Sequence, residues 1–180
     1  MILPITQYGN PVLRKKCKRV NEVTDELRSF ADDMVETMKD AEGVGLAAPQ
    51  VDRDLQLAIV DVSHDPECIS YLRVDGEETD LADLMPLIFI NPELELGKEK
   101  EASTEGCLSI EGITAPVKRP TEVIAKLEQL DGKVITVETD GLLSRAIQHE
   151  TDHLNGVLFT DRLSTASKVS IRRKLKRLGS

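Results

Sequence analysis

The residues with the clearest chemical potential are two histidines, His149 and His153, in the string His149-Glu150-Thr151-Asp152-His153. On an α-helix, side chains four positions apart lie on one face, so both imidazoles can bind the same metal ion. Glu150 lies next to the first histidine, where it can accept a proton from a water molecule on that metal. The spacing therefore indicates a hydrolytic metal site. An exposed helix that matches the pattern by chance is the alternative.

A third metal ligand must come from elsewhere in the chain, because catalytic sites of this type usually have three protein ligands and one open position. Cys107 is the better candidate, since Gly106 lets the backbone approach closely and a nearby cation favours the thiolate. His64, the remaining histidine, lies in a polar segment. A buried, inert thiol is the alternative for Cys107, and it is our interpretation of Cys17 and Cys68.

The helix that must carry the histidines runs from about Asp140 to Asn155. Its apolar residues occupy nearly all sides, which predicts a largely buried element; they are Leu142, Leu143, Ala146, Ile147 and Leu154. Ionisable side chains inside such a helix are costly unless they have ligands or partners. Burial therefore favours a metal site over a chance match.

Two further helices are predicted. An amphipathic helix from Thr24 to Glu42 has Thr24 as a plausible N-cap and Gly43 where it would stop. A last helix spans about residues 165–179, with apolar residues on one stripe and basic residues elsewhere. The stripe consists of Ile171, Leu175 and Leu178.

The remaining segments predict strands and loops. Residues 63–80 are polar and predict an exposed excursion. The predicted loop covers residues 43–50, the strands cover Leu55–Val62 and Leu87–Asn91, with Pro92 interrupting the second, and a hairpin covers residues 122–130 and 133–138 around Asp131-Gly132. Because helices and strands do not alternate regularly, the order predicts an α+β fold, and we expect one domain over residues 1–180.

Composition excludes several classes of protein. The 180 residues are 40% hydrophobic and 31% charged, which is typical of a globular protein. Aromatic residues make up only 3%, which argues against a stacking platform for single-stranded nucleic acid. Three cysteines without a framework spacing favour a reducing compartment. With no signal peptide and no apolar stretch that could span a bilayer, we expect a cytoplasmic protein that does not enter membranes.

The charge is unevenly distributed along the chain. The formal net charge is −9, yet residues 162–180 carry seven Lys or Arg and no Asp or Glu. A basic tail on an acidic body indicates contact with an anionic surface. A solvated helix face is the alternative interpretation.

Three strings, taken together, resemble the signature motifs of peptide deformylases in both order and spacing. They are Gly43-Val44-Gly45-Leu46-Ala47-Ala48-Pro49-Gln50, Glu105-Gly106-Cys107-Leu108-Ser109 and Gln148-His149-Glu150-Thr151-Asp152-His153. The opening Pro11-Val12-Leu13-Arg14 is similar too, so that the likeness spans essentially residues 1–165.

The resemblance implies an enzyme that hydrolyses the N-formyl group of N-formylmethionyl nascent polypeptides and releases formate. It implies antiparallel sheets packed around a central metal-binding helix, with one divalent ion bound by Cys107, His149 and His153. Many members use Fe2+, and a thiolate with two imidazoles is also compatible with Zn2+, Ni2+ or Co2+. The fourth position would hold a water molecule that Glu150 deprotonates.

The same resemblance gives roles to neighbouring residues. The Gln50 side-chain amide and the backbone N–H of Leu108 would stabilise the oxyanion that forms on attack. Glu150 would then protonate the departing amine. Asp152 needs a partner on a buried helix, and the family pattern implies Arg119; a solvated carboxylate is the alternative.

The substrate pocket should lie beside the histidines. Val44, Leu142 and Ala146 could line an apolar pocket for a methionine side chain, and the Gly45 backbone could pair with the peptide. Arg145 lies on the same face, and we expect its stem to pack while its head reaches water. Residues 110–114 lack the basic residue that some members carry there for contacting the substrate backbone.

Two other functions remain open. A metalloprotease could use the same histidine pair, but it needs a cleft that accepts chain on both sides of the scissile bond. A non-enzymatic, metal-stabilised protein could dock its basic tail on ribosomal RNA. A deformylase could use that tail to reach the ribosome, where its substrate emerges. The basic residues concerned are Lys168, Arg172, Arg173, Lys174, Lys176 and Arg177. The oligomeric state and the role of residues 63–83 stay open.

Overall fold

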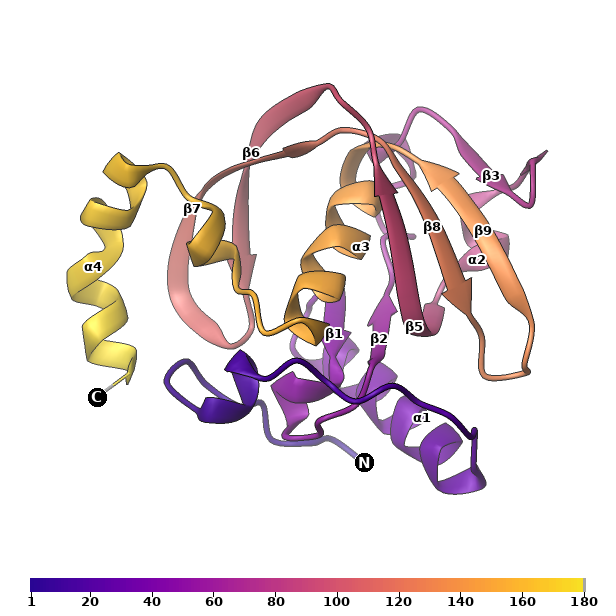
Figure 1. The fold of residues 1–180 in the computed structure, drawn as a ribbon, viewed down its shortest axis with the longest axis horizontal. Coiled ribbons are helices and arrows are strands. Elements are labelled where there is room, and N and C mark those ends of the chain that lie inside the picture. Colours follow the sequence, from indigo (N-terminus) through magenta and orange to yellow (C-terminus); the bar gives the residue numbers. More distant parts are fainter. Residues whose placement is uncertain (180) are drawn as a thin grey trace.

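The computed structural model describes residues 1–179, with one helix, α3 (Gly141–Leu154), at the centre of the antiparallel sheets (Figure 1). One sheet has seven strands in the order β1-β2-β5-β8-β9-β3-β4, and a second sheet consists of β6 and β7. The strands are β1 Gly45–Ala47, β2 Leu57–Val60, β3 Leu72–Val74, β4 Glu77–Glu78, β5 Leu87–Leu96, β6 Lys100–Cys107, β7 Ile110–Pro120, β8 Val123–Glu128 and β9 Val134–Thr139. The predicted α+β class with antiparallel sheets around a central helix is confirmed.

Three further α-helices and four 3-10 turns complete the fold. They are α1 Asp25–Asp40, α2 Leu81–Leu84, α4 Thr165–Gly179, η1 Pro11–Arg14, η2 Ala48–Val51, η3 Pro66–Cys68 and η4 Phe159–Arg162. Within residues 1–179, no helix has the length and apolar character needed to cross a membrane.

α3 is buried, as its apolar pattern predicts. Leu143, Ile147 and Leu154 are almost fully buried in a cluster with residues of the seven-stranded sheet. Asp140 and Asn155, the predicted limits of the helix, are its N-cap and C-cap residues. The central helix therefore has one side fixed by apolar packing, while its other side faces the β6–β7 hairpin.

Residues 63–80 are not the wholly exposed excursion that their polarity predicts. They contain β3 and β4, and β3 extends the large sheet by pairing with β9. Leu72 in β3 is buried. The segment also reaches the start of α3, where the Ser70 N–H donates to Asp140 Oδ1 at 2.7 Å. Strands of two or three residues are too short to give a periodic signal in the sequence.

Two predictions about strands need correction. The predicted loop at residues 43–50 contains β1, which pairs with β2. β5 does not stop before Pro92 but continues to Leu96, because the register shifts between Ile90 and Glu93 and Asn91 takes a left-handed conformation, φ 50°. Such a bulge removes the need for a ladder hydrogen bond from the proline. The hairpin β8–β9 is present as predicted.

The long hairpin β6–β7 was not predicted. Its second strand buries alternate residues, Ile113, Ala115, Val117 and Arg119, while the residues between them face solvent. The alternation is hard to recognise because one of the buried positions is an arginine. This hairpin is the element that brings Cys107 to α3.

The end of α1 differs from its prediction in one respect. Thr24 caps the helix as expected, since its Oγ1 accepts from the Leu27 N–H at 3.1 Å. The helix ends at Asp40, and the left-handed residue after it is Glu42, with φ 56°, rather than Gly43. Gly43 serves close packing instead, because a Cβ there would lie 2.8 Å from Leu108 Cδ1.

α4 lies at the edge of the molecule beyond β7 (Figure 1). Ile171 is buried, and Leu175 and Leu178 pack against the same apolar cluster, which includes Phe159 and Leu163. The predicted apolar stripe therefore faces the protein. The basic residues of α4 are exposed.

The start of α3 gives a test of the fold. Gly141 has φ 57°, and a Cβ there would overlap the Cys68 carbonyl oxygen. We expect Gly141→Ala to lower the free energy of unfolding by about 2–3 kcal/mol, because backbone strain adds to a steric clash. Gly76, with φ 83° and no neighbour within 4 Å, is the matched control, and Gly76→Ala should cost about 1 kcal/mol. If urea denaturation gave equal losses in the free energy of unfolding for the two variants, the predicted effect of the clash at Gly141 would be wrong.

Candidate active site

The three predicted metal ligands lie together. Cys107 ends β6, whereas His149 and His153 lie on α3, and one ligand atom from each falls within 4.8 Å of the others. The Cys107 Sγ is 3.3 Å from His153 Nε2, and the two Nε2 atoms are 3.2 Å apart. A thiolate and two imidazoles at these positions could hold one metal ion.

The charges around the cluster fit a cation. Burial lowers the pKa of His149, but hydrogen bonds with Cys107 and Glu105 outweigh burial and raise it to about 10, so the site stabilises positive charge. Burial and the charge on His149 hold the pKa of His153 well below its usual value, which leaves this imidazole neutral and able to bind a metal.

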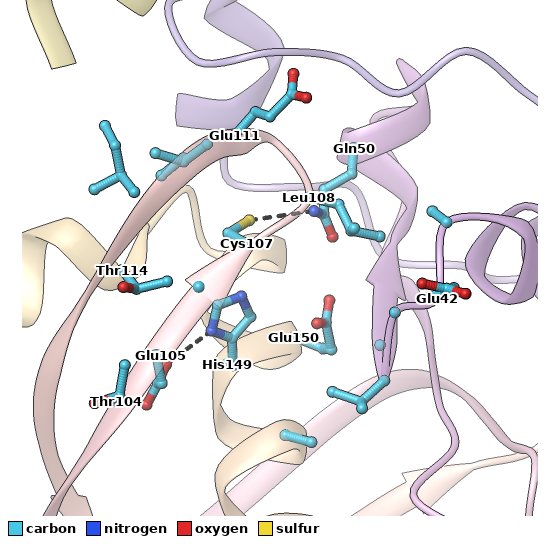
Figure 2. Close-up of a pocket in the computed structure, with 18 of the residues that line it drawn as sticks. Glu42, Gln50, Thr104, Glu105, Cys107, Leu108, Glu111, Thr114, His149 and Glu150 are labelled. Carbon is cyan, nitrogen blue, oxygen red and sulfur yellow. Dashed lines mark hydrogen bonds and ion pairs between the residues drawn. The ribbon is translucent and has the colours of Figure 1, made fainter. Parts of the chain in front are cut away.

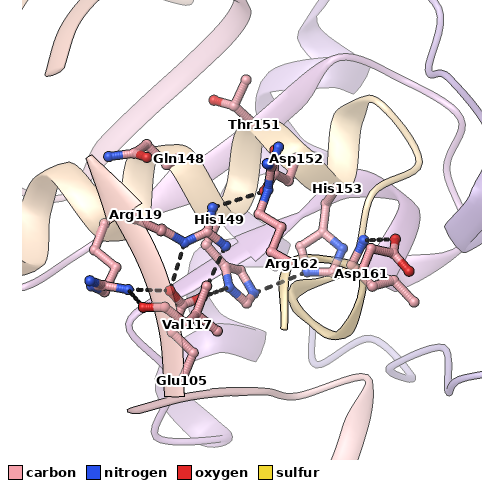
Figure 3. A network of polar contacts seen from close by, with 12 residues as sticks. Glu105, Val117, Arg119, Gln148, His149, Thr151, Asp152, His153, Asp161 and Arg162 are labelled. Atoms are coloured by element: carbon pink, nitrogen blue, oxygen red, sulfur yellow. Dashed lines mark hydrogen bonds and ion pairs between the residues drawn. The ribbon is translucent and has the colours of Figure 1, made fainter. Parts of the chain in front are cut away.

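Glu105 organises the ligands, and the sequence did not single it out. Its Oε1 lies 2.9 Å from His149 Nδ1, which leaves Nε2 of that ring for the cluster. Arg119 binds both carboxylate oxygens, at 2.6 and 3.0 Å (Figure 3). Arg145 donates to Oε2 at 2.7 Å. Burial would raise the pKa of Glu105, but the hydrogen bonds from His149 and Arg119 lower it to about 2. Glu105 is therefore a fixed anion.

The ion pairs continue beyond Glu105. The expected contact between Arg119 and Asp152 is present, at 2.9 Å. Arg162 of η4, which the sequence did not indicate, also binds Asp152 through two hydrogen bonds of 2.6 and 2.7 Å (Figure 3). Because Asp152 is only one residue from His153, this chain of charges fixes the helix face that carries the ligands.

The expected orientation of Arg145 is wrong. Its head does not reach water, because its side chain is only 13% exposed and the guanidinium donates to Glu105 and to the carbonyl oxygens of Val117 and Glu101. The β6–β7 hairpin covers this face of α3 and provides acceptors closer than the solvent. Arg145 therefore ties the strand of Cys107 to the helix of the histidines.

Glu150 is buried and its Oε2 has no hydrogen-bond partner within residues 1–179. Its Oε1 lies so close to the backbone of Gly45 that a Cβ there would be 2.5 Å away. Burial raises the pKa of Glu150 to about 7, although the charges of His149 and Arg119 oppose the shift. The carboxyl group can therefore both take up and release a proton near neutral pH.

Gln50 and Leu108 lie at the same site. The Gln50 Oε1 accepts from the Ala47 N–H at 2.9 Å, so Nε2 points to Ser109 Oγ at 3.2 Å and to Cys107 Sγ at 3.4 Å (Figure 2). Leu108 lies between β6 and β7.

The N-terminal segment forms hydrogen bonds with the backbone of Leu108, Ser109 and Gln50. The sequence did not predict these contacts. The Gln7 Nε2 donates to the Leu108 carbonyl at 3.1 Å. The Tyr8 N–H donates to the Ser109 carbonyl at 2.7 Å, and the Thr6 N–H donates to the Gln50 carbonyl at 2.7 Å.

A cavity of about 710 Å³ opens beside the cluster (Figure 2). This volume is typical of a small-molecule site. All five residues proposed to bind substrate line it, namely Val44, Gly45, Leu142, Arg145 and Ala146. Gln50, Cys107, Leu108, His149 and Glu150 line the same cavity, whereas Asp152, Arg119 and His153 do not. A buried carboxyl group, three residues that could hold a metal ion and a cavity beside them form the arrangement that a metal-dependent hydrolase requires.

Comparison with known proteins identifies the family. The sequence model of the family described as polypeptide deformylase matches residues 2–169. The chain belongs to the peptide deformylase family, hydrolases that remove N-formyl groups from nascent peptides. This membership favours the deformylase hypothesis over the protease and the non-enzymatic protein.

Individual relatives cover nearly the whole chain. The peptide deformylase of Methylacidiphilum infernorum is 44% identical over 99% of this chain and 93% of its own length. That of Acinetobacter baumannii is 42% identical over 98% of this chain and 92% of its own. The solved peptide deformylase of Synechococcus elongatus, in complex with actinonin, has a TM-score of 0.81 and 38% identity, covering 98% of this chain and 86% of that one.

Glu105 gives a direct test of the site. We expect Glu105→Gln to weaken metal binding about 10–100-fold, because the orientation and charge of His149 depend on this carboxylate. It should also lower the free energy of unfolding by about 3–5 kcal/mol, since Arg119 and Arg145 lose their buried partner. Metal titration and urea denaturation measure the two effects. Glu101→Gln, on the same strand but exposed, is the control. Unchanged metal affinity in Glu105→Gln would exclude the orienting role.

Proposed function

We propose that this chain hydrolyses the N-formyl group of N-formylmethionyl nascent polypeptides and releases formate, with one divalent cation held by Cys107, His149 and His153. The observation that carries the proposal is the buried Glu150, which has a free oxygen on the cavity that these ligands adjoin. Burying a carboxyl oxygen without a hydrogen-bond partner costs free energy, and groups of this kind are concentrated at functional sites.

The cation, when bound, would supply Lewis acidity that polarises a carbonyl group and lowers the pKa of a water molecule. One thiolate and two imidazoles suit Fe2+, Zn2+, Ni2+ or Co2+. Of these, we propose Fe2+, the ion that the family resemblance implies. Anaerobic purification followed by metal analysis tests the choice.

Glu150 moves the proton. We assign to Oε2, which has no partner in the described chain, the uptake of a proton from the attacking water. The pKa of about 7 allows the same carboxyl group to deliver that proton to the departing amine. Gly45 allows the carboxyl group to occupy this position, because its lack of a Cβ leaves room for Oε1.

Gln50 and Leu108 would stabilise the oxyanion. The Gln50 amide is held by the Ala47 N–H, so its Nε2 is oriented before substrate binds. A backbone N–H from Leu108 would be the second donor. Donors fixed in advance need no reorganisation during the reaction, which is why such groups contribute strongly to rate.

The apolar wall of the cavity would take the methionine side chain. Val44, Leu142 and Ala146 supply this wall, and the Gly45 backbone would pair with the peptide. Arg145 contributes only its stem, because its guanidinium binds the hairpin.

The basic face of α4 would bring the enzyme to the ribosome. All six Lys and Arg residues of this helix are exposed, while Ile171 holds it to the protein. We place the enzyme in the cytoplasm, since its three cysteines form no disulfide and a reducing compartment suits them.

Glu150→Gln tests the mechanism. We expect about a 10²–10⁴-fold loss of kcat for formate release from formyl-Met-Ala-Ser, because the amide cannot take up a proton. Metal content should stay at the wild-type level, since Glu150 is not among the three ligand candidates. Full activity with the metal retained would refute the assigned role, and metal analysis of each preparation is the control.

Charge reversal on α4 tests ribosome binding. We expect Arg173→Glu with Lys174→Glu to weaken co-sedimentation with ribosomes and to reduce its salt dependence, because each phosphate contact releases counterions. Lys133→Glu, which reverses an exposed charge at the β8–β9 turn, is the matched control. Binding by the wild-type protein that does not change with salt would count against the proposal.

A further inference from the structure

Residues 3–8, which we call the N-terminal strap, are attached to the protein at both ends. Leu3 packs against the apolar cluster that contains residues of α1 and β2, and its N–H donates to Thr37 Oγ1 at 2.9 Å. Tyr8 packs against the cluster that contains residues of β7 and α4. The strap therefore connects two separate parts of the core, and the residues between its ends pass beside the active site.

The strap binds the turn that joins β6 to β7. This turn consists of two residues, Leu108 and Ser109, and both of its carbonyl oxygens accept hydrogen bonds from the strap. The Leu108 carbonyl accepts from the Gln7 Nε2 at 3.1 Å, and the Ser109 carbonyl accepts from the Tyr8 N–H at 2.7 Å. Carbonyl groups of a tight turn lie outside the strand ladder, so they need donors of this kind from elsewhere.

The strap also binds the other proposed oxyanion donor. The Thr6 N–H donates to the Gln50 carbonyl at 2.7 Å, while the Gln50 side chain points to Ser109 Oγ at 3.2 Å. Thr6 and Tyr8 act through their backbone, whereas Gln7 acts through its side chain. The contact of Gln7 can therefore be removed by substitution without a change in the backbone of the strap.

The position of Gln7 matters because of what lies next to the bonded carbonyl. The Leu108 carbonyl and the Leu108 N–H are joined through one Cα with two soft dihedral angles, so fixing the carbonyl restricts the directions open to the N–H. Gln7 is exposed and lines the cavity, and its Nε2 also lies 3.4 Å from the Ile5 carbonyl, which holds the side chain back against the strap. Without this amide, water would be the donor, and water does not hold the turn in one orientation.

We propose that Gln7 is a positioning residue, whose Nε2 holds the Leu108 carbonyl so that the Leu108 N–H is directed at the oxyanion. The inference rests on the proposed deformylase function. A donor oriented in advance stabilises the transition state more than the bound substrate, so the contribution belongs to kcat. One hydrogen bond between neutral groups contributes modestly, and we therefore expect an effect of about three- to tenfold.

The first experiment compares formate release from formyl-Met-Ala-Ser by the metal-loaded wild-type protein and two variants at about pH 8. Gln7→Met keeps the length of the side chain but removes the donor, and kcat should fall about three- to tenfold while KM stays within about twofold of its wild-type value. Gln7→His should keep kcat within about twofold of wild type. Its Nε2 is separated from the Cα by as many bonds as the glutamine amide nitrogen, and the ring is uncharged at this pH.

A second readout needs no turnover. In zinc-loaded protein with isotope-labelled leucine, the amide resonance of Leu108 should shift in Gln7→Met and return to near its wild-type position in Gln7→His. Gln129→Met is the matched control, because Gln129 is a half-buried glutamine that does not line the cavity and whose side chain makes no hydrogen bond within residues 1–179. It should change neither kcat nor the Leu108 resonance.

Three results would overturn the inference. An unchanged kcat in Gln7→Met would show that the donor is dispensable, and a raised KM with unchanged kcat would show that Gln7 contacts the peptide instead. A loss in Gln7→Met that Gln7→His does not restore would exclude the hydrogen bond as the cause. No formate from the wild-type protein, with the metal bound, would refute the proposed function itself, and the Leu108 resonance would still decide whether Gln7 orients the turn.

Discussion

The structure depends on one buried carboxylate. Glu105 lies between β6–β7 and α3, and it accepts hydrogen bonds from Arg119 and Arg145 and bonds to His149. A buried charge is tolerated only when it is paired and hydrogen-bonded. The partners of Glu105 come from both elements, so satisfying this charge fixes the hairpin that carries Cys107 against the helix that carries the histidines.

The surroundings of two glutamates in the same site shift their pKa values in opposite directions. Glu105 is surrounded by donors, and these lower its pKa to about 2. Glu150 is buried against Gly45 without a cationic partner of its own, and burial raises its pKa to about 7. One carboxyl group is thereby suited to hold charge and the other to exchange a proton. The chain thus provides an orienting group from β6 and a candidate acid–base group from α3.

Much of the fold and site could be predicted from sequence. The histidine spacing and the apolar surroundings of α3 indicated a buried metal-binding helix, and Thr24 marked the start of α1. Glu105 was missed because a lone acid in a polar run reads as exposed. Its burial arises only when Arg119, fourteen residues away, folds back along the hairpin.

The other differences have similar causes. Arg145 was expected to reach water, but the carbonyl acceptors that hold it come from strands whose pairing was not predicted. Pro92 was predicted to end a strand. The left-handed conformation of Asn91, which lets the strand continue past the proline through a register shift, leaves no clear signal in the sequence. Tertiary pairing, rather than local preference, decided both cases. The organisation as one domain stays a prediction.

X-ray absorption spectroscopy of the anaerobically prepared, metal-loaded protein tests the central claim most directly. The account predicts one sulfur at roughly 2.3 Å and two imidazole nitrogens with one exchangeable oxygen at roughly 2.0–2.2 Å. Cys107→Ala should remove the sulfur contribution alone. A metal shell without sulfur, or one closed by four protein ligands, would contradict the account.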